Sequence, residues 1–190
     1  DARVLVLGLA PGAHGANRTG RPFTGDGAGP FLYGALHRAG YASRPHSEAR
    51  DDGLELAGAR ITNAVRCVPP GNRPSTEEVA ACLPYLEREL ALLSDLRVIL
   101  CLGGIAWQTA LRTLAGMGAE IPRPRPRFGH GSEADLGPGR PRLVGAYHPS
   151  QLNTRTGRLT EPMFDEVMAR VAALADSPGG AARAARGRRG

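Results

Sequence analysis

Four short apolar runs, each followed by a turn-rich stretch and then by a segment that can be helical, constrain the fold of this chain most. The runs cover residues 4–7, 61–65, 98–102 and 143–147. The helical candidates cover residues 30–39, 76–93, 105–114 and 161–174. Buried strands that alternate with helices are typical of a mostly parallel sheet. The sequence therefore predicts an α/β domain with a four-stranded sheet.

The helix expected at residues 76–93 has a clear start signal. Ser75 precedes it as an N-cap residue, and Glu78 follows three positions later. This spacing is that of a capping box, in which each side chain bonds the backbone N–H of the other residue.

The length of 190 residues suits one domain with a sizeable core. We expect this domain to cover residues 1–175 and the low-complexity, arginine-bearing residues 176–190 to be disordered. No apolar run approaches the roughly 20 residues that span a bilayer, so no membrane association is expected. The chain starts without Met at its first strand, which suggests a missing N-terminal segment.

All basic side chains are arginines, and the net charge is +6. Guanidinium groups offer a planar fork of donors that suits phosphate, although a solvated basic surface explains the charge equally well. Residues 121–131, IPRPRPRFGHG, alternate Pro and Arg, and we expect this segment to be extended and basic. The three cysteines do not look like a secreted disulfide framework, which favours a cytoplasmic protein.

Polar residues gather in the loops that follow the predicted strands. They occur in GLAPGAHGANRTGR at residues 8–21, RCVPPGNRP at 66–74 and YHPSQLNTRTGR at 147–158. Ligands of open parallel sheets bind at the carboxyl ends of the strands, where these loops meet. The first loop does not match G-x-G-x-x-G, and the chain has neither GxxxxGK[ST] nor G-x-S-x-G. These absences argue against dinucleotide, ATP and serine-hydrolase sites.

His148 ends the last predicted strand and is followed by Pro149. An imidazole fixed in this way could donate a hydrogen bond to an anionic leaving group, or it could merely cap the next loop. Two glycine turns, NRTGR at 17–21 and NTRTGR at 153–158, lie at the same sheet edge. Small polar loops of this kind can approach a nucleic-acid backbone closely, although both could also be plain surface turns.

Three stretches together resemble the family 5 uracil-DNA glycosylases, the iron–sulfur branch of the uracil-DNA glycosylase superfamily. They are GLAPGAHGANRTGR-x-FTGD, ITNAVRCVPPGN-x-P and YHPSQ-x-NT-x-TGRLTEPM. The resemblance implies a three-layer α/β/α sandwich around a four-stranded parallel sheet. It also implies a monofunctional DNA glycosylase of base excision repair, which flips uracil, hypoxanthine or xanthine out of DNA and hydrolyses the N-glycosidic bond. The expected substrate is double- or single-stranded DNA that contains deaminated bases. The expected enzyme is a nucleoid-associated cytoplasmic monomer that needs no cofactor for the chemistry.

The same resemblance assigns roles to individual residues. Phe23 is the aromatic side chain expected to stack on the flipped base, and Asn63 is the amide expected to face its edge. His148 is expected to stabilise negative charge on the departing base. The base pocket is expected to comprise Gly8, Leu9, Ala10, Pro11, Gly12, His14 and Phe23.

The first loop carries no carboxylate where relatives in the superfamily place an acidic or amide residue, because Leu9 and Ala10 occupy those positions. We therefore expect Asp26 to supply the negative charge near the sugar, with His14 and Asn17 as polar helpers. Asp26 could instead only cap the helix that begins near Pro30.

The predicted DNA contacts are Asn17, Arg18, Arg21, Ser150, Gln151, Asn153, Arg155 and Arg158. The resemblance also implies a structural [4Fe–4S] cluster, for which Cys67 and Cys82 match two of the four thiolate ligands. Cys101 lies in an apolar run and is better explained as a core residue. Two other functions stay open: a non-catalytic protein that binds damaged DNA or abasic sites, and a nucleoside hydrolase.

Overall fold

The computed structural model describes residues 1–177, so most of the predicted disordered tail lies outside the described residues. Five strands form one sheet: β1 (Val4–Gly8), β2 (Ala59–Asn63), β3 (Val98–Leu102), β4 (Glu133–Ala134) and β5 (Arg142–Ala146). The helices are α1 (Ala16–Thr19), α2 (Gly29–Arg38), α3 (Thr76–Leu92), α4 (Gly104–Gly116), α5 (Gln151–Arg155) and α6 (Glu161–Asp176), with a 3₁₀ turn η1 (Pro70–Asn72).

The sheet has the strand order β2-β1-β3-β5-β4. β2, β1, β3 and β5 pair in parallel, and the two-residue β4 pairs antiparallel with β5. The predicted α/β class and the four parallel strands are confirmed. The fifth strand was not predicted, because two residues are too few to show an alternating pattern.

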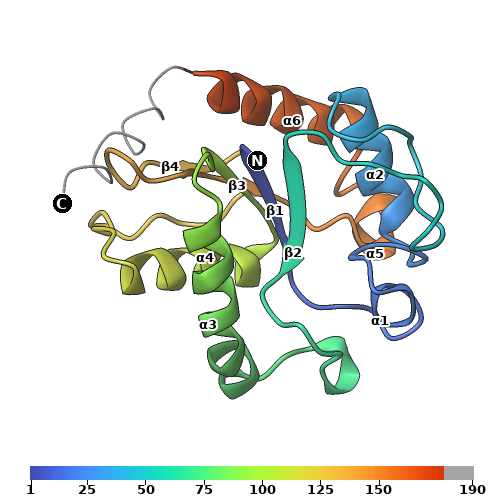
Figure 1. Cartoon of the computed structure of the whole chain (residues 1–190), viewed down its shortest axis with the longest axis horizontal. Helices are drawn as coiled ribbons and strands as arrows, with labels where there is room; N and C mark the ends of the chain where they lie inside the picture. Colours follow the sequence, from blue (N-terminus) through green and yellow to red (C-terminus); the bar gives the residue numbers. More distant parts are fainter. Residues whose placement is uncertain (178–190) are drawn as a thin grey trace.

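Helices cover both faces of the sheet, with α2 and α6 on one side and α3 and α4 on the other (Figure 1). Val4 and Val6 of β1 pack in the core under α2 and α6, whereas Leu5 and Leu7 pack with Trp107 of α4. Every residue of β1 is buried, as expected for a strand covered on both faces. This three-layer arrangement leaves the two ends of the parallel strands for function.

The predicted helices are present with shifted ends. The capping box of α3 has formed: Ser75 Oγ accepts from the Glu78 N–H at 3.1 Å, and Glu78 Oε2 accepts from the Ser75 N–H at 2.7 Å. α6 continues to Asp176, whose carboxylate pairs with Arg3 at 2.9 Å. The helix therefore includes the residue at which we expected the disordered tail to begin.

Residues 121–131 form neither helix nor strand, as expected, and their three arginines are exposed. The segment is fastened to α4, because the Trp107 Nε1–H donates to the Pro126 carbonyl at 3.0 Å. None of the helices within residues 1–177 is long and apolar enough to cross a membrane.

Candidate functional site

The candidate site lies at the carboxyl end of the sheet, where β1 ends at Gly8 and β2 ends at Asn63. The two loops stay paired beyond the strands. Ala64 N–H donates to the Gly8 carbonyl at 3.0 Å, and Val65 N–H donates to the Leu9 carbonyl at 2.9 Å. These bonds fix the backbone of the first loop against the chain that carries Asn63.

Gly8 lies between two predicted site residues. A Cβ atom at this position would lie 2.4 Å from Asn63 Oδ1 and 2.8 Å from Cζ of Phe23. Real Cβ atoms do not approach other atoms so closely, so any side chain here would push Asn63 and Phe23 away. The glycine of the first loop is therefore what lets the amide and the aromatic ring converge.

Asn63 brings an unpaired acceptor to this point. Its Oδ1 atom is buried and has no hydrogen-bond partner among the described residues. An unpaired buried acceptor costs about 1–3 kcal/mol, so such atoms are rare unless a ligand uses them. The side chain of Asn63 is thus ready to bind an N–H group that the protein itself does not supply.

Phe23 is buried and has a φ of 59°, in the left-handed region that non-glycine residues rarely occupy. Three contacts hold its loop in this conformation. The Tyr33 hydroxyl donates to the Pro22 carbonyl at 2.7 Å, and the Thr24 and Ser47 hydroxyls lie 2.6 Å apart. The Phe23 carbonyl lies so close to Gly29 that a Cβ there would be 2.1 Å from it.

Arg21 strengthens the same loop from within the protein. Its guanidinium pairs with Asp52 at 2.7 Å and donates to Ser47 Oγ at 2.9 Å. The hydrogen bond from Arg21 lowers the pKa of Asp52 most, and the backbone N–H groups of Leu54, Glu48 and Ala49 lower it further, so it lies well below its usual value. Arg21 was predicted to contact DNA; its guanidinium is bound to the segment around Asp52, and the DNA contact stays a prediction.

His148 follows β5 and completes the cluster. Its ring centroid lies 5.9 Å from that of Phe23, and its carbonyl accepts from Asn153 Nδ2 at 2.8 Å. Burial lowers the pKa of His148 below 6.5, and the charge of Asp26 opposes this effect only in part. The imidazole is therefore neutral at pH 7, and it can still donate one N–H.

Asp26 is half-buried and caps the start of α2. Its Oδ1 atom accepts from the N–H groups of Ala28 at 3.0 Å and Gly29 at 2.9 Å. Gly12 lies over the carboxylate, with the position of a Cβ 4.0 Å from Asp26 Oδ2. The capping function that we considered is thus present, and the catalytic role of Asp26 stays a prediction.

The other side chains of the first loop range from buried to exposed. Pro11 is buried, Leu9 and Ala10 are half-buried, and His14 and Asn17 are exposed. No hydrogen bond of the described residues ties the His14 ring or the Asn17 amide to the cluster of Gly8, Phe23, Asn63 and His148. The two polar side chains that we expected to help position water therefore stand at the rim of the site.

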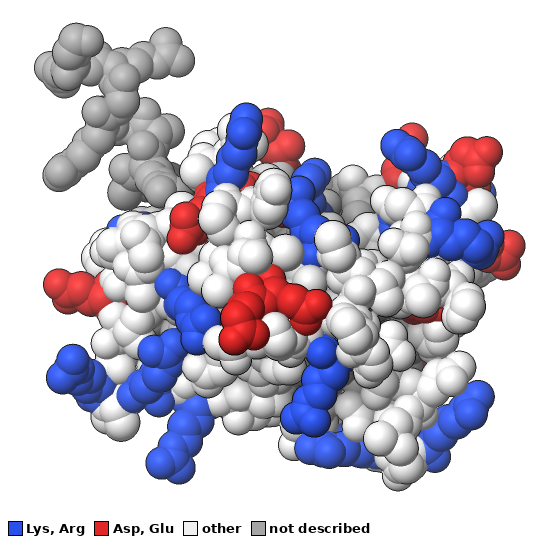
Figure 2. Space-filling view, turned by 90° about the horizontal axis from the view of Figure 1, so that it is seen from below, with Lys and Arg blue, Asp and Glu red and all other residues white. Residues whose placement is uncertain are grey.

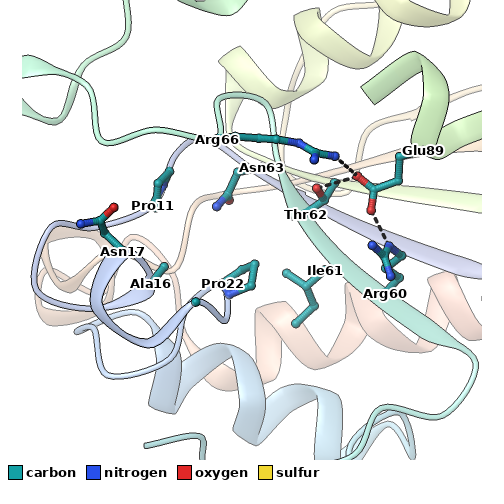
Figure 3. Close-up of a pocket in the computed structure, with 11 residues that line it drawn as sticks. Pro11, Ala16, Asn17, Pro22, Arg60, Ile61, Thr62, Asn63, Arg66 and Glu89 are labelled. Carbon is teal, nitrogen blue, oxygen red and sulfur yellow. Dashed lines mark hydrogen bonds and ion pairs between the residues drawn. The ribbon is translucent and has the colours of Figure 1, made fainter. Parts of the chain in front are cut away.

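A cavity of about 410 Å³ opens beside Asn63 along the outer edge of β2. Figure 3 shows Asn63 between Pro11 and Thr62, with Asn17 on the far side. The buried Glu89 closes one end: it accepts from Thr62 Oγ1 at 2.9 Å and from Arg66 at 3.1 Å, and it also pairs with Arg60. Pro11, Asn17 and Asn63, three predicted site residues, thus share one cavity.

The loop after His148 has two kinds of side chain. Ser150 caps α5 by accepting from the Asn153 N–H at 3.4 Å, and the Asn153 amide supports His148, so both have partners within the protein. Arg155 is exposed, and so is Arg158, which lies 4.9 Å from the centre of the Tyr147 ring. The exposed arginines are free to reach a partner in solution.

Gln151 joins this loop to the one that carries Phe23 and Asp26. A Cβ on Gly27 would lie 2.5 Å from Gln151 Nε2, so the amide lies directly over that glycine. The next residue, Leu152, is 73% exposed. We did not predict a function for Leu152, although an apolar side chain in an otherwise polar loop is a signal that could have revealed one.

Arginines are distributed over much of the surface rather than in one patch. Figure 2 shows several groups of them on the lower side of the molecule, with carboxylates between the groups. Arg18 in the first loop is exposed, and its Nε–H donates to the His14 carbonyl at 3.1 Å. Binding of an anionic polymer would therefore depend on particular loops rather than on a uniform field.

The cysteines lie apart from this cluster. Cys67 is exposed in the loop after β2, Cys82 is half-buried in α3, and Cys101 is buried in β3, as expected for a core residue. Burial raises the pKa of the Cys101 thiol strongly. Residues 1–177 hold no group of three or more His, Cys, Asp or Glu side chains suited to a metal ion. The described residues therefore do not form a complete cluster site.

Comparison with known proteins identifies the family. A sequence model of the uracil DNA glycosylase superfamily matches residues 1–172. The chain is 53% identical over 174 residues to a type-5 uracil-DNA glycosylase of Mycobacterium tuberculosis, which covers 91% of this chain and 63% of the relative.

Two further relatives have the same description. The type-5 uracil-DNA glycosylase of Thermus thermophilus is 49% identical over 92% of this chain and 77% of its own length. That of Pyrobaculum aerophilum is 44% identical over 91% of this chain and 72% of its own. The chain spans just under two thirds of the length of its Mycobacterium tuberculosis relative. The α/β fold, the match over residues 1–172 and these identities together show that the chain belongs to the type-5 branch of the uracil-DNA glycosylase superfamily.

Proposed function

We propose that this protein is a monofunctional DNA glycosylase that removes uracil, hypoxanthine and xanthine from DNA. The observation that carries the proposal is the convergence of Phe23 and Asn63 at Gly8, with His148 beside the Phe23 ring and the Asn63 Oδ1 atom buried and unpaired among the described residues. An aromatic face, an amide and a neutral imidazole suit a flat heterocycle with polar edges. Such a base reaches the site only after it is flipped out of the helix.

Asn63 accounts for the rejection of cytosine and adenine. Uracil, hypoxanthine and xanthine each present a ring N–H beside a carbonyl, which is the pattern that deamination creates. Oδ1 of Asn63 accepts from the N–H, and Nδ2 donates to the carbonyl. Cytosine and adenine present a ring nitrogen acceptor beside an amino donor, which leaves the buried Oδ1 unpaired.

His148 acts on the leaving base. The bond between C1′ and the base nitrogen breaks, its electron pair goes to the base, and water adds to C1′. The N–H of neutral His148 donates to a carbonyl oxygen of the base as negative charge develops there. A proton from the water finally balances the charge on the released base. The products are the free base and an abasic site.

Asp26 is proposed to stabilise positive charge on the sugar. Its charge raises the pKa of His148 against the effect of burial, which supports a position near the scissile bond, and Gly12, whose Cβ would lie 4.0 Å from Oδ2, has no side chain to cover this atom. A carboxylate within a few ångströms of an oxocarbenium-like sugar lowers the barrier to bond cleavage. His14 and Asn17 at the rim are proposed to hold the attacking water.

The DNA partner is proposed to lie across the loops that carry Asn17, Arg18, Gln151, Arg155 and Arg158. Leu152 projects from the same surface and suits the gap that a flipped base leaves in the stack. Three exposed arginines of the Pro–Arg segment, Arg123, Arg125 and Arg127, add phosphate contacts beside α4. We propose that the protein acts on DNA as a monomer in the cytoplasm, in association with the nucleoid.

Cys67 and Cys82 are proposed as two of the four ligands of a [4Fe–4S] cluster. Arg66 lies 5.1 Å from the centre of the Tyr85 ring, which brings the loop of Cys67 to the part of α3 that contains Cys82. The third cysteine, Cys101, is buried in β3, so these residues supply two of the four thiolates. Such a cluster would stabilise the fold, and no step of the chemistry uses it. An iron assay and a visible spectrum of anaerobically purified protein test this point, and colourless, iron-free protein would refute it.

The experiment that tests the function uses duplexes that contain a single uracil, hypoxanthine or xanthine, with the protein in excess. Alkali cleaves the strand at any abasic site that has formed. Strand breaks at the lesion, and none in cytosine- or adenine-containing controls, are the expected result. Salt-sensitive binding without breaks would instead identify a damaged-DNA binder, and activity on free nucleosides alone would identify a nucleoside hydrolase.

A further inference from the structure

We infer that His130, which no sequence motif assigned, is a positioning residue that fixes the direction of His148; the inference rests on the proposed function. His130 lies in the Pro–Arg segment, 17 residues before Tyr147 in the sequence. Its Nδ1 atom accepts from the Tyr147 N–H at 3.1 Å, and Tyr147 is the direct neighbour of His148. The other ring nitrogen, Nε2, lies 3.1 Å from the Met163 carbonyl.

These two partners determine the protonation state of the ring. A backbone N–H can only donate, so Nδ1 must be free of a proton. A carbonyl can only accept, so Nε2 must carry one. Neutral His130 therefore joins the end of β5 to the first turn of α6, and it has no nitrogen left over for a ligand.

The hydrogen bond from Tyr147 to His130 pairs a backbone N–H at the end of β5 that lies beyond the reach of β4. β4 pairs with β5 as far as Val144, and Gly131 and Ser132 extend this pairing to Gly145 through two bonds of 2.8 Å. Beyond that position the neighbouring segment forms a turn, in which the Ser132 N–H donates to the Gly129 carbonyl at 3.3 Å. The imidazole of His130 takes the place of the next carbonyl, so the last N–H before His148 is paired.

Close packing places the imidazole of His130 where it can accept from the Tyr147 N–H. The carbonyl of Gly129 lies so close to Gly145 that a Cβ there would be 2.5 Å from it, and this approach brings His130 over the end of β5. The ring centroids of His130 and Tyr147 are 5.0 Å apart. Arg158 lies 4.9 Å from the centre of the same Tyr147 ring. Tyr147 is thus held through both its backbone and its side chain, and the direction of His148 follows from it.

Two substitutions separate the two bonds of His130. His130→Asn places an amide oxygen where Nδ1 lies, so it keeps an acceptor for the Tyr147 N–H and loses the link to Met163. His130→Gln places an amide nitrogen where Nε2 lies, so it keeps the link to Met163 and loses the acceptor. Thr160→Ala removes the N-cap of α6 and serves as the control for loosening of that helix.

The first measurement is the hydrogen exchange of the Tyr147 amide by NMR, which does not depend on activity. We expect this amide to stay protected in the wild type, in His130→Asn and in Thr160→Ala. In His130→Gln we expect its exchange to become more than tenfold faster, while the Gly145 amide, bonded to Ser132, keeps its protection. Unchanged protection of Tyr147 in His130→Gln would overturn the inference.

The second measurement is single-turnover cleavage of uracil-containing duplex, with the dissociation constant measured separately. His130→Gln is expected to lower the cleavage rate at saturating enzyme by about 10- to 100-fold and to leave the dissociation constant within about twofold. His130→Asn should restore the rate to within about threefold of the wild type. Equal losses in both variants, in step with their melting temperatures, would show that His130 is merely structural. A wild type without cleavage would refute the proposed function and leave the exchange result as the test of His130.

Discussion

The carboxylate of Asp26 and the burial of His148 act in opposite directions on the pKa of the imidazole. Burial is the stronger effect and disfavours the charged ring, whereas the nearby negative charge favours it. Asp26→Asn removes only the second effect. We therefore expect the pKa of His148 to fall further in this variant, and an NMR titration of the imidazole measures it. Asp26→Glu keeps the charge and is the control, and a pKa that rises in Asp26→Asn would contradict the assignment.

Gly8→Ala should impair catalysis and lower the free energy of unfolding by about 1–3 kcal/mol. The added methyl group would lie 2.4 Å from Asn63 Oδ1 and 2.8 Å from the Phe23 ring, so both side chains must move by about an ångström. A displacement of this size costs about 100-fold in rate. Single-turnover cleavage beside a thermal melt measures the two effects. Gly131→Ala, at a glycine with open space around it, controls for backbone effects, and equal rates for Gly8→Ala and the wild type would argue against the proposed pocket.

Asn63→Ala should separate stability from activity. The buried Oδ1 atom has no partner, so its removal should leave the free energy of unfolding unchanged or raise it by up to about 1 kcal/mol. The rate of cleavage should fall about 100- to 1,000-fold, because the amide contacts a base only in the productive complex. Urea denaturation and cleavage of uracil and hypoxanthine duplexes measure the two quantities. A variant that is both unstable and fully active would show that Asn63 is a structural residue.

Asp52→Asn should loosen the loop of Phe23. The substitution removes the ion pair with Arg21 and weakens the acceptors for the Glu48 and Leu54 amides, which should cost about 1–3 kcal/mol at pH 7. The pKa of Asp52 is lower in the folded protein than in the unfolded chain, where it is about 3.9. Its stabilising contribution is therefore complete above pH 4 and is lost as the pH falls below that value.

Denaturation curves of the wild type and Asp52→Asn from pH 3 to pH 7 test this pH dependence, with Asp51→Asn at the exposed neighbouring residue as the control. A gap between wild type and Asp52→Asn that widens toward pH 3 would contradict it.

The Pro–Arg segment should contribute to the salt dependence of DNA binding. Each phosphate contact adds about 0.9 to the slope of log affinity against log salt concentration. Replacing Arg123, Arg125 and Arg127 together by Ala should lower this slope by about 2 to 3 and leave cleavage at saturating enzyme unchanged. Arg97→Ala with Arg140→Ala, at the opposite end of the strands, is the control. The control lacks two arginines instead of three, so an equal loss of slope per removed arginine in both variants would mean that only net charge matters.

The sequence predicted the strands and helices well, but it did not predict the tertiary contacts that position the site residues. The four parallel strands and the capping box at Ser75 follow from local patterns, which is why both were predictable. Phe23 and Asn63 were identified through the resemblance to the family, and His148 also through its place at the end of a predicted strand before Pro149. Asp52 and His130 did not, because their partners are 31 and 17 residues away and are set only by tertiary packing. The internal ion pair of Arg21 was not predicted either, since a basic residue in a polar loop gives no sign that it is bound within the protein.

The close approach of Asn63 and Phe23 over Gly8 also limits how this protein can evolve. At that point the wall of the site is bare main chain, which no substitution can cut back further. Mutation at residue 8 can therefore only narrow the range of bases that enter, never widen it. Activity on bulkier bases must therefore evolve by shortening the side chains of residues near Gly8. The half-buried Leu9 is the first of these residues.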